Sequence, residues 1–293
     1  MQLDVPLARL ARRVPRFRGW HRLLEPLRRM FVKVYADRPE RWIVIDDFER
    51  DLRMRLDRSA YMSSLIYWRG IHSFSEASLI RAFLPPEGVF LDVGANQGEL
   101  TLVAARKASR GQVFAFEPVP EWFQLLSENI ALNGFEHVTA VPAALAEQEG
   151  TVEMFTSSDR QLHAGFHEGL STFHRTEYRN VPVGQFPTTS MDAFVASKAL
   201  LRVDLIKIDV EGAEKAVLAG AQGTLRRFRP MLILELNEGT FSSAGYTGAE
   251  FVASLRELGY ALFDVDPFGR ITPLAERGLA EFGTLFARHE VLG

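Results

Sequence analysis

The stretch VFLDVGANQGELTLVAARKA, residues 89–108, decides the fold of this 293-residue chain. Residues 89–93 form a short apolar run, glycines follow at 94 and 98, and apolar residues recur at helical spacing from 99 to 108. Glycine permits a tight turn and lets a ligand approach the backbone, while the start of a helix offers free N–H groups to an anion. The stretch predicts a strand, a turn and a helix, with a ligand at the turn as one interpretation and a purely structural turn as the other.

Short apolar strands and helices alternate on the C-terminal side of this stretch. Strands are predicted at 113–116, 138–143, 205–209, 231–235, 260–265 and 281–287, and helices at 120–132, 213–224 and 247–258. This alternation is typical of βαβ units and predicts an α/β fold with a mainly parallel sheet covered by helices on both faces. The last two strands have no convincing helix between them, so we expect that pair to be antiparallel.

Residues 41–87, on the N-terminal side, predict a small lead-in or cap region ahead of a main domain at 88–293. Apolar strands at 42–45 and 52–56 flank a polar turn, as in a hairpin. Residues 75–84 predict a helix that is capped by Ser75 and stopped by two prolines.

Composition excludes several classes of protein. The chain is 47% hydrophobic and 24% charged, which is typical of a globular protein and not of a disordered or fibrous one. It has no cysteine, which excludes disulfides, cysteine-bound zinc, iron–sulfur clusters and a thiol nucleophile. Because we find no run of 18 apolar residues and no apolar signal segment, we expect a cytoplasmic protein. The net charge of −3 gives no reason to expect nucleic-acid binding.

Residues 1–40 predict a basic helical arm. Nine basic and two acidic residues among the first 33 give +7, which leaves −10 for the rest of a chain whose total is −3. Apolar residues are interspersed among the arginines. One interpretation is a peripheral helix that binds an anionic membrane or another anionic partner. The simpler interpretation is a solvated helix packed on the body of the protein.

Residues 156–186 interrupt the alternation with 31 residues that lack strong periodicity. Loops this long inside a compact domain usually serve function, so we predict a lid or acceptor-binding loop. His163 and His167 have helical metal-ligand spacing, but no third ligand is evident, and polar loop histidines are the better interpretation. His174 is a candidate base toward a bound hydroxyl.

Polar residues at the carboxyl ends of the strands are the candidate site, because ligands bind there in open α/β sheets. The first strand ends at Asp92, and the turn that follows lacks the spacing G-x-G-x-x-G. A pyrophosphate would be repelled by Asp92. The ammonium of an amino acid would be attracted to it, while helix N–H groups could bind the carboxylate of the same amino acid. This favours S-adenosylmethionine over NAD.

The second and third strand ends suit a nucleoside. Glu117, followed by Pro118, lies 19 positions after Gly98. Its carboxylate can accept hydrogen bonds from both ribose hydroxyls, which NAD and S-adenosylmethionine share. Ala143 and Ala144 are small enough to border an adenine ring.

The fourth strand ends in charged residues. Because side chains alternate along a strand, Lys207, Asp209 and Glu211 lie on one side of the chain. Burial of these charged groups costs free energy unless they are paired or take part in the function. A structural ion pair is one interpretation. The other places Asp209 beside the methyl donor or the acceptor. Asp209, Glu235 and Asn237 could orient a hydroxyl or hold a divalent cation through oxygen ligands, although we do not favour a metal.

The chain resembles the FkbM family of S-adenosylmethionine-dependent methyltransferases. The matching segments are FLDVGANQGELTL (90–102), FAFEPVPEWFQLLSENIALNG (114–134), AAL (143–145), DLIKIDVEGAEKAVLAGA (204–221) and RPMLILELNE (229–238). The resemblance implies a class I methyltransferase fold, which is a Rossmann-like, seven-stranded sheet with an antiparallel last strand. It also implies O-methylation of a sugar or a polyketide-like natural product.

The resemblance also implies roles for individual residues. The cofactor would contact Asp92, Gly94, Ala95, Asn96, Gly98, Thr101, Glu117, Pro118, Ala143, Ala144 and Asp209. The candidate catalytic residues are Asp209, Glu211, Lys207 and His174.

We therefore expect transfer of a methyl group to a hydroxyl of a small molecule. The alternatives are a nicotinamide-dependent oxidoreductase and a non-catalytic protein that binds a membrane surface. A nucleic-acid methyltransferase is disfavoured for two reasons. The Asn/Asp-Pro-Pro-aromatic signature of enzymes that methylate amino groups is absent, and the chain has no cysteine for the cysteine-dependent reaction.

Overall fold

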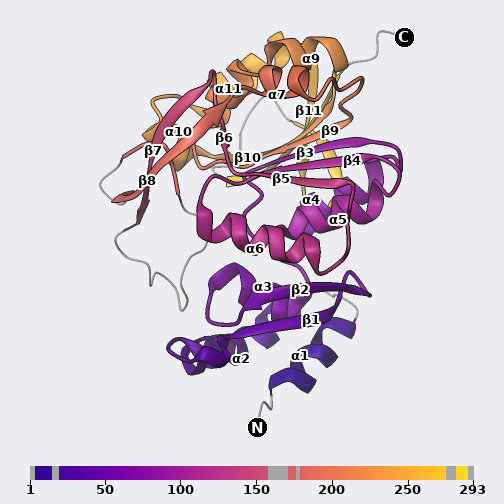
Figure 1. The fold of residues 1–293 in the computed structure, drawn as a ribbon, viewed down its shortest axis with the longest axis vertical. Coiled ribbons are helices and arrows are strands. Elements are labelled where there is room, and N and C mark those ends of the chain that lie inside the picture. Colours follow the sequence, from indigo (N-terminus) through magenta and orange to yellow (C-terminus); the bar gives the residue numbers. More distant parts are fainter. Residues whose placement is uncertain (1–3, 15–19, 158–170, 176–178, 275–281, 290–293) are drawn as a thin grey trace.

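The computed structural model is a three-layer α/β protein with a smaller N-terminal region packed against one side (Figure 1). It describes residues 4–14, 20–157, 171–175, 179–274 and 282–289. Within these ranges, no helix is both long and apolar enough to cross a membrane.

The central sheet has the strand order of the class I methyltransferase fold, with one short strand added. In spatial order the strands are β12 (Ile271–Pro273), β11 (Tyr260–Val265), β13 (Phe282–His289), β10 (Met231–Asn237), β9 (Leu205–Ile208), β3 (Val89–Val93), β4 (Gln112–Phe116) and β5 (Val138–Val141). Neighbours from β10 to β5 are parallel, and β13 is antiparallel to both β10 and β11. The antiparallel last strand is confirmed.

The eighth strand, β12, was not expected. The chain reverses after β11 in a turn that the Asp266 carboxylate closes by accepting the N–H groups of Phe268 and Arg270. The three residues of β12 then pair antiparallel with β11. The strand is too short, and too close to a proline, to give a periodic signal.

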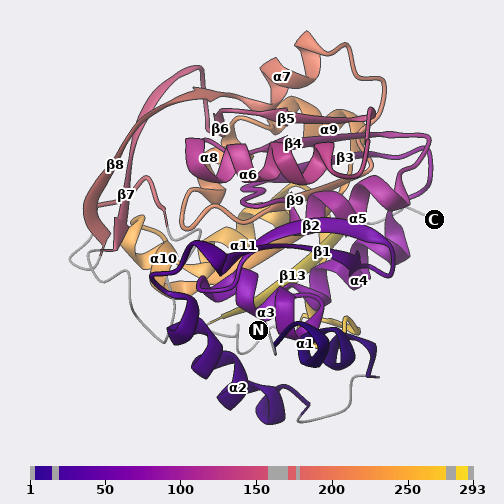
Figure 2. The ribbon, with the colours of Figure 1, turned by 60° about the horizontal axis from the view of Figure 1, so that its bottom comes forward.

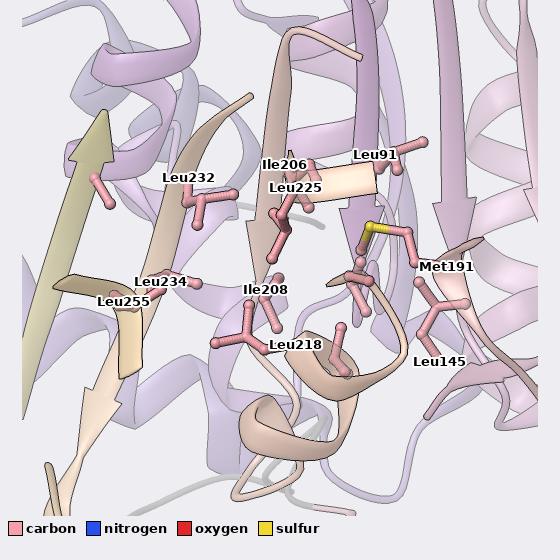
Figure 3. Packing of buried hydrophobic residues seen from close by; sticks show 14 of the residues in the cluster. Leu91, Leu145, Met191, Ile206, Ile208, Leu218, Leu225, Leu232, Leu234 and Leu255 are labelled. Atoms are coloured by element: carbon pink, nitrogen blue, oxygen red, sulfur yellow. The ribbon is translucent and has the colours of Figure 1, made fainter. Parts of the chain in front are cut away.

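Helices cover both faces of the sheet because its strands are apolar on both sides. One face packs on α4 (Phe74–Phe83), α5 (Glu99–Lys107) and α6 (Pro120–Ala131). The other packs on α7 (Met191–Ser197), α8 (Glu214–Ala219), α9 (Gln222–Phe228) and α11 (Gly248–Glu257). Adjacent residues such as Phe90 and Leu91 belong to opposite core clusters, as the two-residue period of a strand requires. Figure 3 shows Leu91, Ile206, Ile208, Leu232 and Leu234 in the core cluster between the sheet and the helices α7, α8, α9 and α11.

Two helix predictions needed correction. The helix predicted at 213–224 is divided into α8 and α9, because Gly220 lies so close to the chain after β6 that a Cβ there would be 2.1 Å from the Ala146 carbonyl oxygen. The helix predicted from a Ser75 cap begins at Phe74, with Ser73 as its cap residue. The Glu99 carboxylate accepts the N–H groups of His72 and Ser73 at this helix start.

A second sheet replaces much of the predicted 156–186 loop. It is formed by β6 (Ala144–Leu145), β8 (Arg179–Thr189) and β7 (Gly150–Ser157), with β7 and β8 antiparallel. Pro182 and Gly184 interrupt the apolar pattern of β8, and the register shifts near them, which explains why the strand was missed. Of the remaining loop only residues 171–175 are described, and His163 and His167 lie outside the described residues.

The N-terminal region is a helical layer capped by a hairpin. It comprises α1 (Asp4–Arg13), α2 (Trp20–Tyr35), a 3-10 turn (Pro39–Arg41), the antiparallel strands β1 (Trp42–Phe48) and β2 (Leu52–Asp57), α3 (Tyr61–Arg69) and the connection to α4. Figures 1 and 2 show α1, α2 and α3 together at one end of the molecule. The hairpin predicted at 42–56 is confirmed. The helix α10 (Glu238–Ser243) after β10 was not predicted.

Side-chain amides in the last turn of α6 and just after this helix join the hairpin to the main domain. The Asn133 side chain accepts the N–H of Arg53 and donates to its carbonyl, both at 2.8 Å. Asn129 accepts the N–H of Arg55 at 2.7 Å. The outer edge of β2 is therefore paired with side chains in place of a third strand.

A buried ion pair fixes α1 on this region. Asp4 and Arg58 are almost fully buried and lie 2.7 Å apart. The hydroxyls of Tyr35 and Tyr67 also donate to the Asp4 carboxylate. Burial alone would raise the pKa of Asp4, but these hydrogen bonds and the guanidinium outweigh it and lower the pKa. The arm is therefore packed on the protein through at least its first helix.

The turn between β3 and α5 is built on backbone close to β9. Gly94, Asn96 and Gly98 all have positive φ, at 78°, 50° and 91°. A Cβ on Gly94 would lie 2.0 Å from the carbonyl oxygen of Asp209. Glycine at 94 thus permits both the left-handed conformation and the approach of two strand ends.

We predict that Asp4→Ala destabilises the fold by about 3 kcal/mol, because it leaves the Arg58 guanidinium buried without its partner. Asp46→Ala is the matched control, because Asp46 of β1 also pairs with a residue of α1, Arg9, but this pair is exposed. Loss of the exposed pair should leave the free energy of unfolding nearly unchanged. Urea unfolding measures both. Equal effects of the two substitutions would contradict the role of the buried pair.

We also predict that Gly94→Ala is much more destabilising than Gly134→Ala. Gly134 has a similar φ of 64° but no atom within 4 Å of an added Cβ. The control should therefore lose about 1 kcal/mol from its backbone conformation alone, whereas Gly94→Ala must also displace the Asp209 carbonyl. Thermal unfolding of both variants measures the difference. Similar melting temperatures would show that the close approach at residue 94 is not required.

Candidate functional site

A cavity of about 440 Å³ lies at the carboxyl ends of β3, β4, β9 and β10. The chain leaves β3 toward β4 and β5 on one side of the sheet, and leaves β9 toward β10 on the other. This change of direction is where ligands bind in open α/β sheets. Most of the predicted site residues line the cavity, namely Asp92, Gly94, Ala95, Asn96, Glu117, Pro118, Ala143, Ala144, Lys207, Asp209 and Glu211.

Asp92 lines the cavity with one oxygen still open to a donor. Its Oδ2 accepts a 2.6 Å hydrogen bond from the Thr101 hydroxyl. Its Oδ1 is buried, has no hydrogen-bond donor within the described part of the chain, and lies 3.5 Å from the ammonium of Lys207. Thr101 and Gly98 were predicted to contact the cofactor. They are absent from the cavity lining as described, and they instead support Asp92 and the turn.

The backbone of the turn is already hydrogen-bonded within the protein. The N–H groups of Gly94 and Ala95 donate to the Phe116 carbonyl, and those of Gln97 and Gly98 donate within the turn. Asn96 donates to Glu117. The N–H groups that the helix geometry leaves without an intrahelical acceptor therefore belong to the first residues of α5, which begins at Glu99 as predicted.

Glu117 is fixed at the end of β4. Its Oε2 accepts the N–H of Asn96 and its Oε1 accepts the N–H of Val119, both at 2.9 Å. Burial raises the pKa of Glu117 to about 7, although the two backbone bonds oppose this rise. Each carboxylate oxygen keeps a lone pair for a further donor. The geometry suits a ligand with two neighbouring hydroxyls.

The cavity beside Glu117 is largely apolar. Its walls include Phe116, Val119, Trp122, Leu145, Met154 and Phe173. Trp122 comes from α6 and Met154 from β7, and both belong to one buried cluster. An aromatic base can therefore be enclosed between the main sheet and the second sheet.

Three carboxylates gather on the opposite side of the cavity. Oxygen atoms of Asp209, Glu211 and Glu235 all lie within 4.8 Å of one another, and no other such group of three acidic or histidine residues occurs in the described ranges. Burial raises the pKa of Glu235 well above its ordinary value, and the charges of Asp209 and Glu211 raise it further. A hydrogen bond with the Asp209 side chain also raises the pKa of Glu235.

Two cations partly balance these carboxylates. Arg179 of β8 lies 2.8 Å from Glu211, and the Lys207 ammonium lies 3.6 Å from Asp209. Burial alone would lower the pKa of Lys207, but the neighbouring carboxylates outweigh it and raise the pKa. Lys207 also donates to the carbonyls of Val93 and Gly94. Arg179 and Lys207 therefore supply positive charge to this group of carboxylates.

Glu214 holds the segment that carries Asp209 and Glu211. It accepts the N–H groups of Val210 and Gly212 and lies 3.1 Å from the Tyr246 hydroxyl. Burial raises the pKa of Glu214 to about 7. The side chain thus stabilises a tight segment in which Glu211 has a positive φ of 53°.

His174 lies next to this segment. Its ring contacts Gly212 and hydrogen-bonds to the Gly212 backbone, and burial lowers its pKa. Asp209 and Glu211 line the cavity directly, whereas His174 is not one of the described lining residues.

Several cavity residues were missed in the sequence. Tyr61 and Met62 come from α3, His72 precedes α4, and Phe282 begins β13. Arg179 comes from β8, which was predicted as loop. These residues reach the cavity through tertiary packing and carry no local motif. The one available signal was Arg179, a basic residue in a loop already predicted to bind the acceptor.

Comparison with known proteins agrees with this geometry. The family described as "Methyltransferase FkbM domain" matches residues 92–262. The 31-O-demethyl-FK506 methyltransferase FkbM of Streptomyces tacrolimicus is 29% identical over 160 residues, which is 47% of this chain and 61% of that protein. The 2-O-methyltransferase NoeI of Sinorhizobium fredii is 27% identical, over 49% of this chain and 61% of its own length.

A third relative is the hexuronic acid methyltransferase AglP of Haloferax volcanii, which is 29% identical over 59% of this chain and 66% of its own length. The match to each of these three relatives spans less than two thirds of the relative. The family match, in contrast, covers more than half of this chain and includes both sides of the cavity. The chain belongs to the FkbM methyltransferase family.

Proposed function

We propose that this protein transfers a methyl group from S-adenosylmethionine to a hydroxyl of a sugar or another natural product. One observation carries the proposal. A single cavity has a carboxylate suited to ribose, Glu117, on one side and the carboxylates Asp209 and Glu235 on the other. The names of the relatives FkbM, NoeI and AglP, which refer to O-methylation or to a hexuronic acid, support a hydroxylated small molecule as the acceptor.

The residues present fit S-adenosylmethionine. The unsatisfied Oδ1 of Asp92 can accept from the ammonium of the methionine part. Glu117 can accept from the ribose hydroxyls, and Ala143, Ala144 and Trp122 can border the adenine ring. A dinucleotide would instead place a pyrophosphate beside the buried Asp92 carboxylate, at a cost in free energy. When bound, S-adenosylmethionine supplies a methyl group activated by a sulfonium.

Asp209 is the best-placed base. Its side chain is 41% exposed and lines the cavity, whereas Glu211 is paired with Arg179 and burial raises the pKa of Glu235 well above its ordinary value. The Asp209 carboxylate would accept the proton of the acceptor hydroxyl while the hydroxyl oxygen forms its bond to the methyl carbon, the bond from that carbon to sulfur breaks and S-adenosylhomocysteine is left. Lys207 would hold Asp209 and the turn at Gly94 in one arrangement. His174 remains the second candidate for the base.

We predict that affinity for S-adenosylhomocysteine falls as the pH is lowered through about 7. Burial raises the pKa of Glu117 to about 7, and hydroxyl donors favour its ionised form, so binding below that pH must first release a proton. The dissociation constant should rise by up to about tenfold per pH unit below 7. Calorimetry measures it.

Glu117→Gln is the control for that titration, and it should bind more weakly with little dependence on pH between 6 and 8, a range set by the value of about 7 for Glu117. NADH is titrated in parallel. Binding of NADH without binding of S-adenosylhomocysteine by well-folded protein would overturn the proposed function.

We predict that Asp209→Asn lowers the rate of methyl transfer by roughly 100-fold or more, as expected for the loss of a general base. The assay supplies methyl-labelled S-adenosylmethionine and fractionated cell extract, and the labelled product identifies the acceptor. Affinity for S-adenosylhomocysteine should be unchanged. Asp264→Asn, on β11 outside the cavity lining, is the control. An Asp209→Asn variant with full activity would transfer the role of base to another residue.

A further inference from the structure

Exposed apolar side chains are concentrated on the two N-terminal helices. Ten large apolar residues are exposed in the described part of the chain, and six of them belong to α1 and α2. These six are Leu7, Leu10, Leu23, Leu27, Met30 and Val34. Figure 2 shows both helices at the outer surface of the molecule, beyond α3. The helices are therefore packed on the body through one side only.

On α2 the exposed apolar residues form one stripe. Residues 23, 27, 30 and 34 follow the helical spacing of four, three and four, and their exposed fractions range from 38% to 64%. Leu24 and Val32 lie on another side of the helix and are at most 8% exposed. Arg28 is also buried there and donates to the Ser64 hydroxyl of α3 at 2.8 Å. The stripe is thus additional to the side that holds α2 on the protein.

Basic residues flank this stripe. Arg22, Arg29 and Lys33 are exposed on α2, each one position before a stripe residue, which places them along one border of the stripe. On α1, Arg13 is exposed near Leu10, and the exposed Arg9 is paired with Asp46. The first 33 residues carry a net +7 and the rest of the chain −10. The two N-terminal helices are therefore the part of the molecule that attracts an anionic partner.

The combination of features selects a partner. A nucleic acid would neutralise the arginines but leave the leucines in water. A second copy docked symmetrically on this surface would oppose arginines to arginines. An anionic bilayer meets both requirements, because lipid headgroups neutralise the basic border while the apolar stripe enters the interface between headgroups and acyl chains.

We propose that the exposed surface of α2, together with Leu7 and Leu10 of α1, docks the protein on an anionic lipid bilayer. The other, buried side of α2 reaches the wall of the cavity. The Arg28 guanidinium lies 5.1 Å from the centre of the Tyr61 ring, and Tyr61 lines the cavity. Docking of this surface would hold the cavity near a membrane. The proposal concerns binding alone and does not depend on methyl transfer.

The test is sedimentation of the full chain with vesicles. One set is phosphatidylcholine alone and the other an equimolar mixture of phosphatidylcholine and phosphatidylglycerol. We expect binding to the anionic set that weakens as salt is added. Leu23→Ser with Leu27→Ser should reduce the partition coefficient roughly tenfold or more. Arg22→Glu with Lys33→Glu should reduce the partition coefficient by a similar factor, because each basic residue near an anionic surface increases this coefficient about fivefold.

Leu201→Ser is the matched control, because Leu201 is 87% exposed but lies outside the two helices, and it should bind as the unmodified protein does. Circular dichroism of each variant checks folding. Equal binding by the stripe variants and the control would overturn the proposal, as would the absence of binding to anionic vesicles. Sedimentation velocity without vesicles shows whether the stripe joins two copies of the chain. If the unmodified protein forms a dimer that the leucine variant does not form, and if it does not bind anionic vesicles, the surface serves self-association instead.

Discussion

The ammonium of Lys207 joins the two halves of the main sheet at the site. It donates to the carbonyls of Val93 and Gly94 and lies within 3.6 Å of Asp92 and Asp209. A buried cation is tolerated only when it is paired in this way. Since the turn follows β3 and Asp209 follows β9, this interaction reinforces the pairing of the two strands where their ends meet at the cavity. The close packing of Gly94 against the Asp209 carbonyl reinforces the same arrangement.

The two sides of the cavity are built by different means. The side at Asp92 and Glu117 consists of neighbouring strand ends, so its geometry follows from the register of β3 and β4. The side at Asp209 is completed by segments that are distant in sequence, with Arg179 from the second sheet paired with Glu211, and Glu235 and Asn237 from β10. A family can keep the first side constant and vary the second, which is how one sheet can serve different acceptors.

Much of the fold could be predicted from local sequence, because buried parallel strands and their helices have strong periodicity. The same is true of Asp92, Glu117 and Asp209, since a polar residue directly after an apolar strand has few places to lie other than the edge of the sheet. Tertiary pairing determined the rest. β8 was hidden by Pro182 and Gly184, and helix 213–224 was divided where Gly220 meets the Ala146 carbonyl. Lys207 was identified from its position, but its contact with the Gly94 carbonyl could not be foreseen from the sequence.

The side-chain pairing of β2 by Asn133 and Asn129 has a consequence for the behaviour of the hairpin. A two-stranded ribbon normally offers unsatisfied backbone groups along its outer edge, and such edges recruit strands from other molecules. Here the amide of Asn133 occupies both backbone groups of Arg53. The hairpin therefore has no template for intermolecular β-sheet growth along this stretch as long as it stays on α6, so attachment to the main domain also protects the N-terminal region from aggregation.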